Sequence, residues 1–525
     1  LYVVDELAGW QASYSTSVGI PLVREMVIRD ANHPSVIFWS NGNEGGHNKE
    51  LDDDFGLYDL SKRTVIHAHH KPGNAINGID CNHYEGYYSS EKIMADSNLY
   101  MPTEFFRAMH DGGGAAGLSD MWELHWNNKH GSGGFIWDFA DEGLVRTDMN
   151  NIIDINGLNA ADGVVGPHRE KEGSYNAIKE IYSPVKIWMK SLPEKFSGII
   201  PVENRYHFTN LKQCRFEWKL LNFRSKGDEI PGHKIQRTES FTGPDLSPGA
   251  KGNLTISLPE DWHEHDALSL TAYDKFGVEI YTWVWKTKAN QVLISALINN
   301  PTGKNVEVID QDDVLSLEAN GIGVSFDKKT GQLDKLKNDK SPSLSFGKGP
   351  ILVSGNSSFT GLTHYKEGDS HVVQVTYLGD LKYVRWKMQK NGWLEMTYEY
   401  ELNGNYPFSG ISFHYPEGLV LGAKWLGKGP YRVWKNRTAG VTFDVYEKLY
   451  NNTQTGNSPW TYPEFKGYFS EMVWMELSTM EGKFTVASAD ENLYVRLFDF
   501  YAINGKTPHP TLPAGDISFL DCIPP

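Results

Sequence analysis

The sequence predicts a chain of several domains, in which an α/β region is followed by two all-β regions. Its 525 residues leave room for about three domains of ~150 residues each. Residues 1 to 182 alternate short apolar runs with helical patterns, whereas residues 183 to 525 carry short strand patterns separated by turns. Strands separated by helices indicate βαβ units and a parallel sheet, and consecutive short strands indicate antiparallel sheets.

Residues 1–182 read as a succession of strands and helices. Strands are predicted at "LYVVDE", "SVIFWSNGNE", "NAINGIDCN", "NLYMPTEF" and "GSGGFIWDFADE", and helices at "PLVREMVIRDA", "LDDDFGLYDLSKRTVIHAHH" and around "LSDMWELHWNNK". Several of these strands end in acids, Asn or Gly, and a (β/α)8 TIM barrel keeps its active site at that end of its strands. About six strands are visible, whereas a full barrel needs eight. We therefore expect the C-terminal part of a barrel, with its first two strands upstream of Leu1.

The remaining residues predict β-structure of two kinds. From 183 to 288, alternating runs such as "CRFEWKLLN" and "YTWVWKTK" indicate an immunoglobulin-like β-sandwich of about 100 residues. The polar stretch 289–304 is predicted to be a linker. From 305 to 525 strand follows strand again, which predicts a larger all-β domain, and no repeat period indicates a solenoid or propeller.

Charge and cysteine usage exclude several classes of function. The formal net charge of −16 is spread along the chain and argues against a nucleic-acid partner, which needs a basic face. No apolar run approaches the ~18 residues of a membrane helix, so no membrane partner is predicted. Cys81, Cys214 and Cys522 lie far apart, which gives neither a disulfide framework nor a zinc site.

Two glutamates stand at the ends of predicted strands. Glu44 follows "SVIFWSNGN" and Glu104 ends "NLYMPTE", 104 − 44 = 60 residues later. The strand ends of a barrel converge on one mouth, so the two carboxylates are expected to face each other. Glycoside hydrolysis with retention needs two carboxyl groups ~5–5.5 Å apart, one as nucleophile and one as proton donor. On spacing alone, a solvated loop acid is the commoner interpretation of either glutamate.

The stretch "RDANHPSVIFWSNGNEGGH" resembles the acid/base signature of glycoside hydrolase family 2, which includes the bacterial β-galactosidases and β-glucuronidases. The resemblance continues through "VVDE", "PTEFFRAMHDGGGAAG", "GGFIWDFADEGL", "NGLNAADGVVGPH", "GIIPVENRYHFTNL" and "WLGKGPYRVWKNR". It covers nearly the whole chain and is closest to the large, multidomain β-galactosidases. It implies a galactose-mutarotase-like β-supersandwich for 305–525, and further domains of the same polypeptide upstream of Leu1.

Carried over by position, the resemblance implies that Glu44 is the general acid/base and Glu104 the nucleophile. Asn43 would hydrogen-bond the sugar 2-hydroxyl, although a plain turn residue fits the same place. Asp138 and Asp141 are expected to be structural.

Three further positions would line the sugar pocket. Trp137 would form its floor, with strand core as the alternative, and Asn156 would line its wall, with a turn as the alternative. Tyr84 would lie beside the nucleophile, although His83 and Tyr87 also fit that position.

The sequence departs from the β-galactosidases at the metal site. After "VVDE" those enzymes carry a Glu and a His that bind magnesium together with the acid/base glutamate, whereas this chain has "LAGWQAS". Hard cations need oxygen ligands, so no magnesium is predicted here and no cofactor is required. The sodium site of the family uses an upstream residue and a loop before "NGL" that is shortened here, which puts sodium in doubt.

A second departure is Arg107, where the β-galactosidases place a histidine near the galactose 6-position. Its planar guanidinium suits a carboxylate or sulfate, so the substrate could carry an acidic group. Pairing with Asp111 or Glu142 is the structural alternative.

The leading hypothesis is a retaining exo-β-glycosidase that hydrolyses terminal non-reducing β-D-galactosides of an oligosaccharide or polysaccharide by double displacement. The alternatives are a β-glucuronidase or another enzyme for acidic or sulfated sugars, and an inactive carbohydrate-binding protein. The presence of Glu44, Glu104 and Asn43 counts against the last. The sequence leaves open a homo-oligomer and the compartment, for which bacterial periplasm and cytoplasm both fit.

Overall fold

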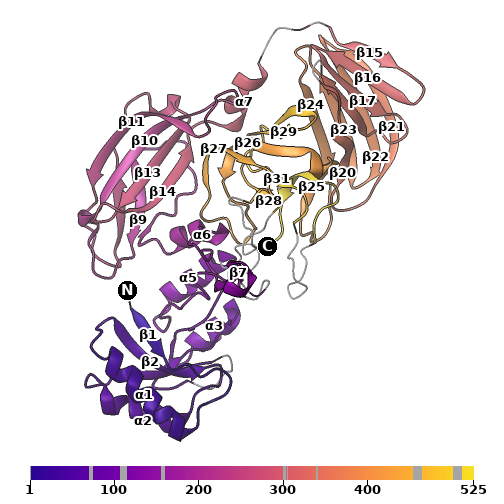
Figure 1. Ribbon diagram of the computed structural model, residues 1–525. Helices are drawn as coiled ribbons and strands as arrows, with labels where there is room; N and C mark the ends of the chain where they lie inside the picture. The colour runs from indigo at the N-terminus through magenta and orange to yellow at the C-terminus, as the bar shows by residue number, and fades with distance from the viewer. Residues whose placement is uncertain are drawn as a thin grey trace. The chain divides into compact units, whose positions relative to one another are not determined.

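The structure is a computed structural model. It describes residues 2–69, 75–106, 115–154, 156, 160–299, 303, 305–338, 341–452, 464–500 and 511–525. The chain divides into two compact units, one formed by Leu1–Ile181 and the other by the described residues from Tyr182 onward (Figure 1). Within the described residues, no helix has both the length and the apolar character needed to cross a membrane.

The first unit consists of parallel strands, helices and one antiparallel hairpin. Its strands are β1 (Val3–Glu6), β2 (Val36–Asn43), β3 (Thr64–Ala68), β4 (Ile79–Asp80), β5 (Leu99–Tyr100), β6 (Leu144–Arg146) and β7 (Ile152–Asp154). Its α-helices are α1 (Thr16–Asp30), α2 (Asp52–Tyr58), α3 (Tyr87–Met94), α5 (Leu118–Asn127) and α6 (Gly173–Ile181), with short 3-10 turns η1 (Lys49–Leu51) and η3 (Thr147–Met149). β6 and β7 form the hairpin.

Parallel pairing runs from each segment to the next along this unit. β1, β2 and β3 form one parallel sheet, and β4 pairs with β5. Isolated parallel bridges continue the series: His69 with Asn82, Tyr100 with Gly131, Phe105 with Ile136, and Ala140 with Val165. Because the strands are parallel and consecutive, their carboxyl ends lie on one edge, as in an α/β barrel.

Helices α1 and α2 cover one face of β2 and fix its position (Figure 1). Val23 and Val27, four residues apart on α1, are buried with Phe55 of α2 and Trp39 of β2 in one cluster. The Trp39 indole N–H donates to Asp59 Oδ2 at 3.0 Å. The strand that leads to Glu44 is therefore anchored by a fully buried tryptophan.

The helix expected over "LDDDFGLYDLSKRTVIHAHH" is wrong beyond its first turns, because α2 ends at Tyr58 and β3 follows at Thr64. The Asp59 carboxylate accepts the backbone N–H groups of Ser61 and Arg63 and turns the chain. Thr64 and the buried Val65 and Ile66 are β-branched, which favours a strand.

The second unit begins with seven antiparallel strands in two sheets. The strands are β8 (Val185–Lys186), β9 (Ile199–Asn204), β10 (Arg215–Phe223), β11 (His233–Thr242), β12 (Lys251–Thr255), β13 (Ala267–Tyr273) and β14 (Glu279–Lys286). Their orders are β11-β10-β13-β14 and β12-β9-β8. Buried residues of both sheets, such as Ile200 and Phe216, share one core. The immunoglobulin-like topology stays a prediction. The predicted linker contains a helix, α7 (Asn290–Ile298).

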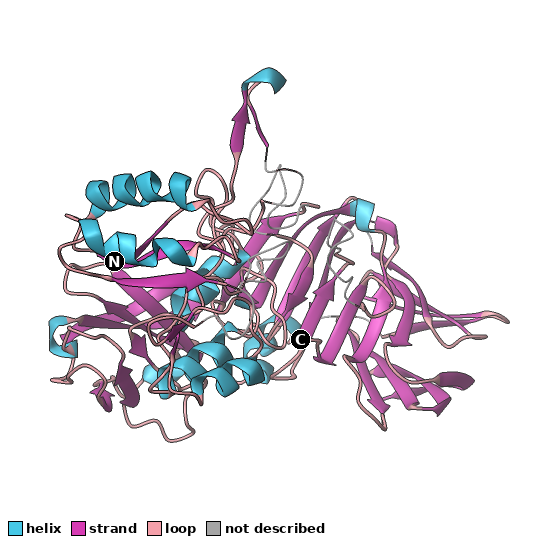
Figure 2. Cartoon of the chain, turned by 90° about the horizontal axis from the view of Figure 1, so that it is seen from below, coloured by secondary structure: helices cyan, strands magenta, loops and turns pink. Residues whose placement is uncertain are grey.

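The rest of the unit is built from β-sheets. Its strands are β15 (Glu307–Asp310), β16 (Val314–Ala319), β17 (Ile322–Asp327), β18 (Leu333–Asn338), β19 (Ser341–Leu344), β20 (Gly347–Leu352), β21 (Ser357–Glu367), β22 (Ser370–Gly379), β23 (Leu381–Met388), β24 (Leu394–Tyr400), β25 (Ser409–His414), β26 (Val420–Gly429), β27 (Thr442–Leu449), β28 (Gly467–Phe469), β29 (Trp474–Thr479), β30 (Gly482–Ala487), β31 (Tyr494–Leu497) and β32 (Ile517–Cys522). They form a ten-stranded sheet and two four-stranded sheets, drawn as magenta arrows in Figure 2. Phe326, Trp386 and Trp425, one from each sheet, lie in a common core. The supersandwich assignment stays a prediction.

Candidate active site

Glu44 directly follows β2, in a loop that only glycine-rich sequence can form. Its backbone N–H donates to Ala68 O at 2.9 Å, which ties the loop to the end of β3. Gly42 and Glu44 have φ of +83° and +49°, in the left-handed region that favours glycine. A Cβ on Gly46 would lie 2.5 Å from the carbonyl carbon of Gly9. The glycines thus allow the segment around Gly9 to lie directly against the loop that carries Glu44.

Glu104 follows β5, and its buried carboxylate is held by two neutral donors. Asn43 Nδ2 donates to Oε1 at 3.1 Å, and the Tyr84 hydroxyl donates to Oε2 at 2.8 Å. Hydrogen bonds donated to a carboxylate favour its ionised form and fix its orientation. This is the arrangement that a carboxylate nucleophile needs.

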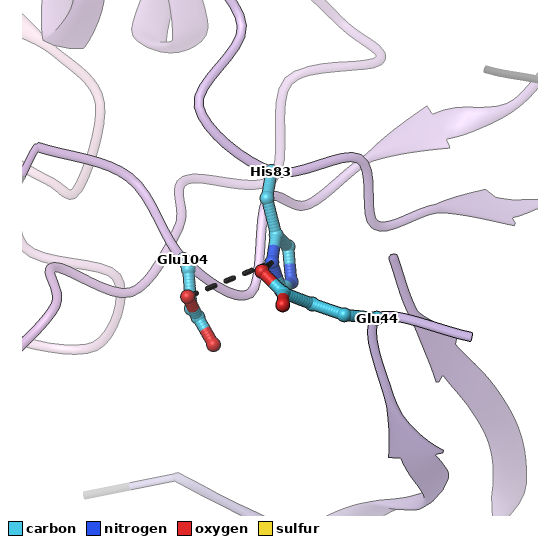
Figure 3. A group of neighbouring side chains, drawn as sticks. All are labelled: Glu44, His83 and Glu104. Atoms are coloured by element: carbon cyan, nitrogen blue, oxygen red, sulfur yellow. Dashed lines mark ion pairs between the residues drawn. The ribbon is translucent and has the colours of Figure 1, made fainter. Parts of the chain in front are cut away.

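The two glutamates converge, as Figure 3 shows. One carboxylate oxygen of Glu44, one of Glu104 and Nδ1 of the buried His83 all lie within 4.8 Å of one another. His83 Nδ1 is 3.8 Å from Glu44 Oε1 and 3.6 Å from Glu104 Oε2, while its Nε2 lies 2.7 Å from Thr103 Oγ1. One oxygen of each glutamate thus lies no more than 4.8 Å from one of the other, which is compatible with the ~5–5.5 Å between the carboxyl groups of retaining glycosidases.

The segment after β1 offers Glu44 hydrogen-bond donors where the sequence comparison expected no magnesium ligands. The segment after β1 presents Trp10 Nε1 and Gln11 Nε2 to Glu44 Oε2, at 2.8 and 3.1 Å. N–H groups are donors and cannot ligate a cation, whereas magnesium takes oxygen ligands in octahedral geometry. Glu44, His83 and Glu104 themselves offer three possible ligand atoms within 4.8 Å of one another, so the absence of magnesium stays a prediction.

A third carboxyl group, Glu6 at the end of β1, belongs to the same neighbourhood. Loss of hydration at this carboxyl raises its pKa, and the nearby charge of Glu104 raises it further. The Ser40 hydroxyl, which donates to Glu6 Oε2 at 2.8 Å, acts in the opposite direction. Because its pKa is raised, Glu6 ionises less readily than an ordinary carboxyl group, and it lies near Glu104.

Trp137 lies on the segment next to that of Glu104. Its backbone N–H donates to Phe105 O at 3.3 Å, beside the bridge between Phe105 and Ile136. The following Asp138 has a pKa raised to about 7, first by burial and then by the charges of Glu142, Asp162 and Asp141.

The other predicted residues fall in different places. Tyr84, and not Tyr87 of α3, brings its hydroxyl to Glu104. Asn156 is exposed after the β6–β7 hairpin, and its N–H donates to Asp154 Oδ1 at 2.8 Å. Arg107 lies outside the described residues, so its role stays a prediction.

Sequence reasoning missed three residues of the cluster. Trp10 and Gln11 lie in the stretch "LAGWQAS", and no spacing or motif in it indicates that their N–H groups donate to Glu44. His83 was considered only as an alternative match for Tyr84. The signal that was available for it is its position in "CNHY", directly after a predicted strand.

Comparison with known proteins shows what this chain is similar to. Residues 11–162 match the TIM barrel domain of glycosyl hydrolases family 2. The β-galactosidase of Priestia megaterium is 24% identical over 527 residues, which cover 88% of this chain and 48% of that protein. The β-galactosidase of Lactococcus lactis subsp. lactis is 30% identical over 508 residues, which cover 85% and 48%. An exo-chitosanase structure from Amycolatopsis orientalis matches 73% of this chain and 55% of its own, at 12% identity and a TM-score of 0.27.

The chain therefore carries a family 2 glycosyl hydrolase barrel domain at its N-terminal side, followed by antiparallel sheets. Over most of its length it is a distant homologue of the β-galactosidases. It spans about half the length of the curated relatives that it matches.

Proposed function

We propose that the protein is a retaining exo-β-glycosidase that hydrolyses terminal non-reducing β-D-galactosides, with Glu104 as nucleophile and Glu44 as acid/base. The observation that carries this proposal is that one carboxylate oxygen of Glu44 and one of Glu104 lie within 4.8 Å of each other, which suits double displacement. The names of the relatives support galactose as the sugar.

In the first step a Glu104 oxygen attacks the anomeric carbon while the glycosidic bond breaks. Glu44 transfers its proton to the glycosidic oxygen, so the leaving group departs as an alcohol and Glu44 becomes a carboxylate. The product is a glycosyl ester on Glu104.

In the second step water attacks the anomeric carbon from the side that the leaving group vacated. Glu44 takes a proton from this water, and Glu104 departs as a carboxylate. Two inversions give net retention, and both residues return to their starting states.

Asn43 is suited to a contact with the sugar as well as with the nucleophile. Its Nδ2 donates to Glu104 Oε1, while its Oδ1 has no hydrogen-bond partner among the described residues. A sugar 2-hydroxyl donated to this oxygen would satisfy it, and such a contact strengthens in the oxocarbenium-like transition state.

A substrate panel tests the proposal on the full-length protein. Nitrophenyl β-galactoside, β-glucuronide and a sulfated β-galactoside are compared, with Glu104→Gln as the blank. The proposal expects galactoside turnover that the blank lacks, and a β-configured sugar as the first product by proton NMR. An α-configured first product would contradict the two-step mechanism.

Arg107 supports one alternative substrate class, a uronide or sulfated galactoside, because its charged fork suits an anion. This alternative expects turnover of the glucuronide or sulfated substrate, lost in Arg107→His. Binding of these sugars without any turnover would favour a carbohydrate-binding protein instead.

A further inference from the structure

We propose that Trp10 and Gln11 are positioning residues for Glu44, and that they decide which of its two carboxyl oxygens delivers the proton. This inference rests on the proposed role of Glu44 as acid/base. Oε2 accepts the Trp10 indole N–H at 2.8 Å and a Gln11 amide N–H at 3.1 Å. Oε1 is the oxygen that faces His83 Nδ1, at 3.8 Å, on the side of the nucleophile.

The two donors distinguish the oxygens chemically. An indole N–H and an amide NH₂ donate hydrogen bonds and do not accept them. An oxygen that accepts two such bonds has both lone pairs engaged, so it serves as the carbonyl oxygen of the neutral carboxylic acid. The proton of Glu44 is then carried by Oε1, the oxygen on the side of His83, whose Nδ1 also lies 3.6 Å from Glu104 Oε2.

Proton transfer in this arrangement leaves the new charge where it is stabilised. The Oε1–H bond breaks, a bond forms between the proton and the glycosidic oxygen, and the electron pair stays on the Glu44 carboxylate. Delocalisation places part of this charge on Oε2, where two N–H donors already point. The donors therefore favour the state that Glu44 reaches after transfer, and no side chain has to reorient.

The backbone holds the donors at a fixed place relative to Glu44. Asn43, the residue before Glu44, donates its N–H to Gly9 O at 2.6 Å and accepts the Gln11 N–H at 3.0 Å. Gln11 has φ of +58°, in the left-handed region, so its backbone does not have the conformation of a strand residue. The chain segment that carries the donors is thus paired with the residue adjacent to the acid/base.

Substrates that differ only in the leaving group test the inference. On the glycone that the full-length protein turns over, an alkyl glycoside needs protonation of its leaving oxygen, whereas a dinitrophenyl glycoside does not. Trp10→Phe and Gln11→Met each remove one donor. Each is expected to lower kcat/KM for the alkyl glycoside about tenfold, the worth of one hydrogen bond to a charged group, and that for the dinitrophenyl glycoside less than about twofold.

Two further variants calibrate the result. Glu44→Gln sets the full effect of losing the acid and is expected to show the same pattern with a larger ratio. Trp188→Phe makes the same substitution at a tryptophan that is 52% exposed outside the site, and should change neither substrate.

The positioning role is overturned if Trp10→Phe and Gln11→Met lower kcat/KM equally on both substrates, or lower it on neither. Hydrolysis by the wild type would still uphold the proposed function in that case. A wild type without turnover of any glycoside would instead overturn the proposed function, and this inference with it.

Discussion

Replacing Tyr84 with Phe should slow the second chemical step more than the first. The Tyr84 hydroxyl donates to Glu104 Oε2 at 2.8 Å. In the proposed mechanism Glu104 starts as a carboxylate, loses its charge when it forms the glycosyl ester, and regains it when the ester is hydrolysed. A donor to this carboxylate therefore opposes ester formation and assists ester hydrolysis.

The size of this effect follows from the strength of the hydrogen bond that is lost. A hydrogen bond to a charged group contributes ~1.5–3 kcal/mol. With about half of the charge recovered in the transition state, loss of the hydroxyl costs roughly 0.75–1.5 kcal/mol, or about three- to thirteenfold in rate. Asn43 still donates to Oε1 at 3.1 Å, so the buried carboxylate keeps a partner and the protein should fold.

Stopped-flow release of nitrophenol measures this effect. Tyr84→Phe is expected to show a burst of nitrophenol, with kcat and KM lowered together because the glycosyl-enzyme accumulates. Tyr88→Phe, at a tyrosine that is 82% exposed on α3, is the control and should behave as the wild type. A raised KM with unchanged kcat, and no burst, would show that Tyr84 binds substrate and does not act on Glu104.

Three other predictions follow from the charges in the structure. Chelation by EDTA should leave hydrolysis unchanged, because Trp10 and Gln11 offer Glu44 donors and not ligands; activity lost to EDTA and restored by magnesium would contradict this. In the folded protein the pKa of Asp138 is about 7, against an ordinary 3.8. Its contribution to the stability of the folded state is therefore lost as pH rises through this range. Asp138→Asn should accordingly raise Tm more at about pH 8 than at about pH 5. Burial lowers the pKa of Lys448 from 10.5 to about 7, so its contribution to stability grows as pH rises through that range. The Tm gained by Lys448→Met should accordingly be larger near pH 7 than near pH 9.5; the opposite pH trend in either variant would show that the charge is not penalised there.

The α/β and all-β regions could be predicted because their periodicities are visible in the sequence. Val23 and Val27 mark the buried stripe of α1, and alternate residues of β10, such as Phe216 and Trp218, face the core. The strand β3 was missed because several consecutive residues of it are buried. A strand that is buried on both faces has no alternation to separate it from a helix.

The candidate site was predictable to the extent that it depends on strand ends. Glu44 and Glu104 follow apolar runs that the structure pairs in one parallel series. The choice between Tyr84 and Tyr87 was not predictable, because it depends on which side chain the fold brings to Glu104, and Tyr87 is the first residue of helix α3. Trp10 was missed for a different reason: a side chain that donates one hydrogen bond to a distant residue leaves no spacing pattern.

The role of Glu104 as the covalent nucleophile is tested most directly by trapping the glycosyl-enzyme. The full-length protein is treated with an activated 2-deoxy-2-fluoro glycoside of the sugar that it turns over, digested, and mapped by mass spectrometry. The two-carboxylate account predicts one sugar per chain, attached to Glu104, and no label in Glu104→Gln. A label on a different carboxylate, or turnover with inversion and no label at all, would contradict it.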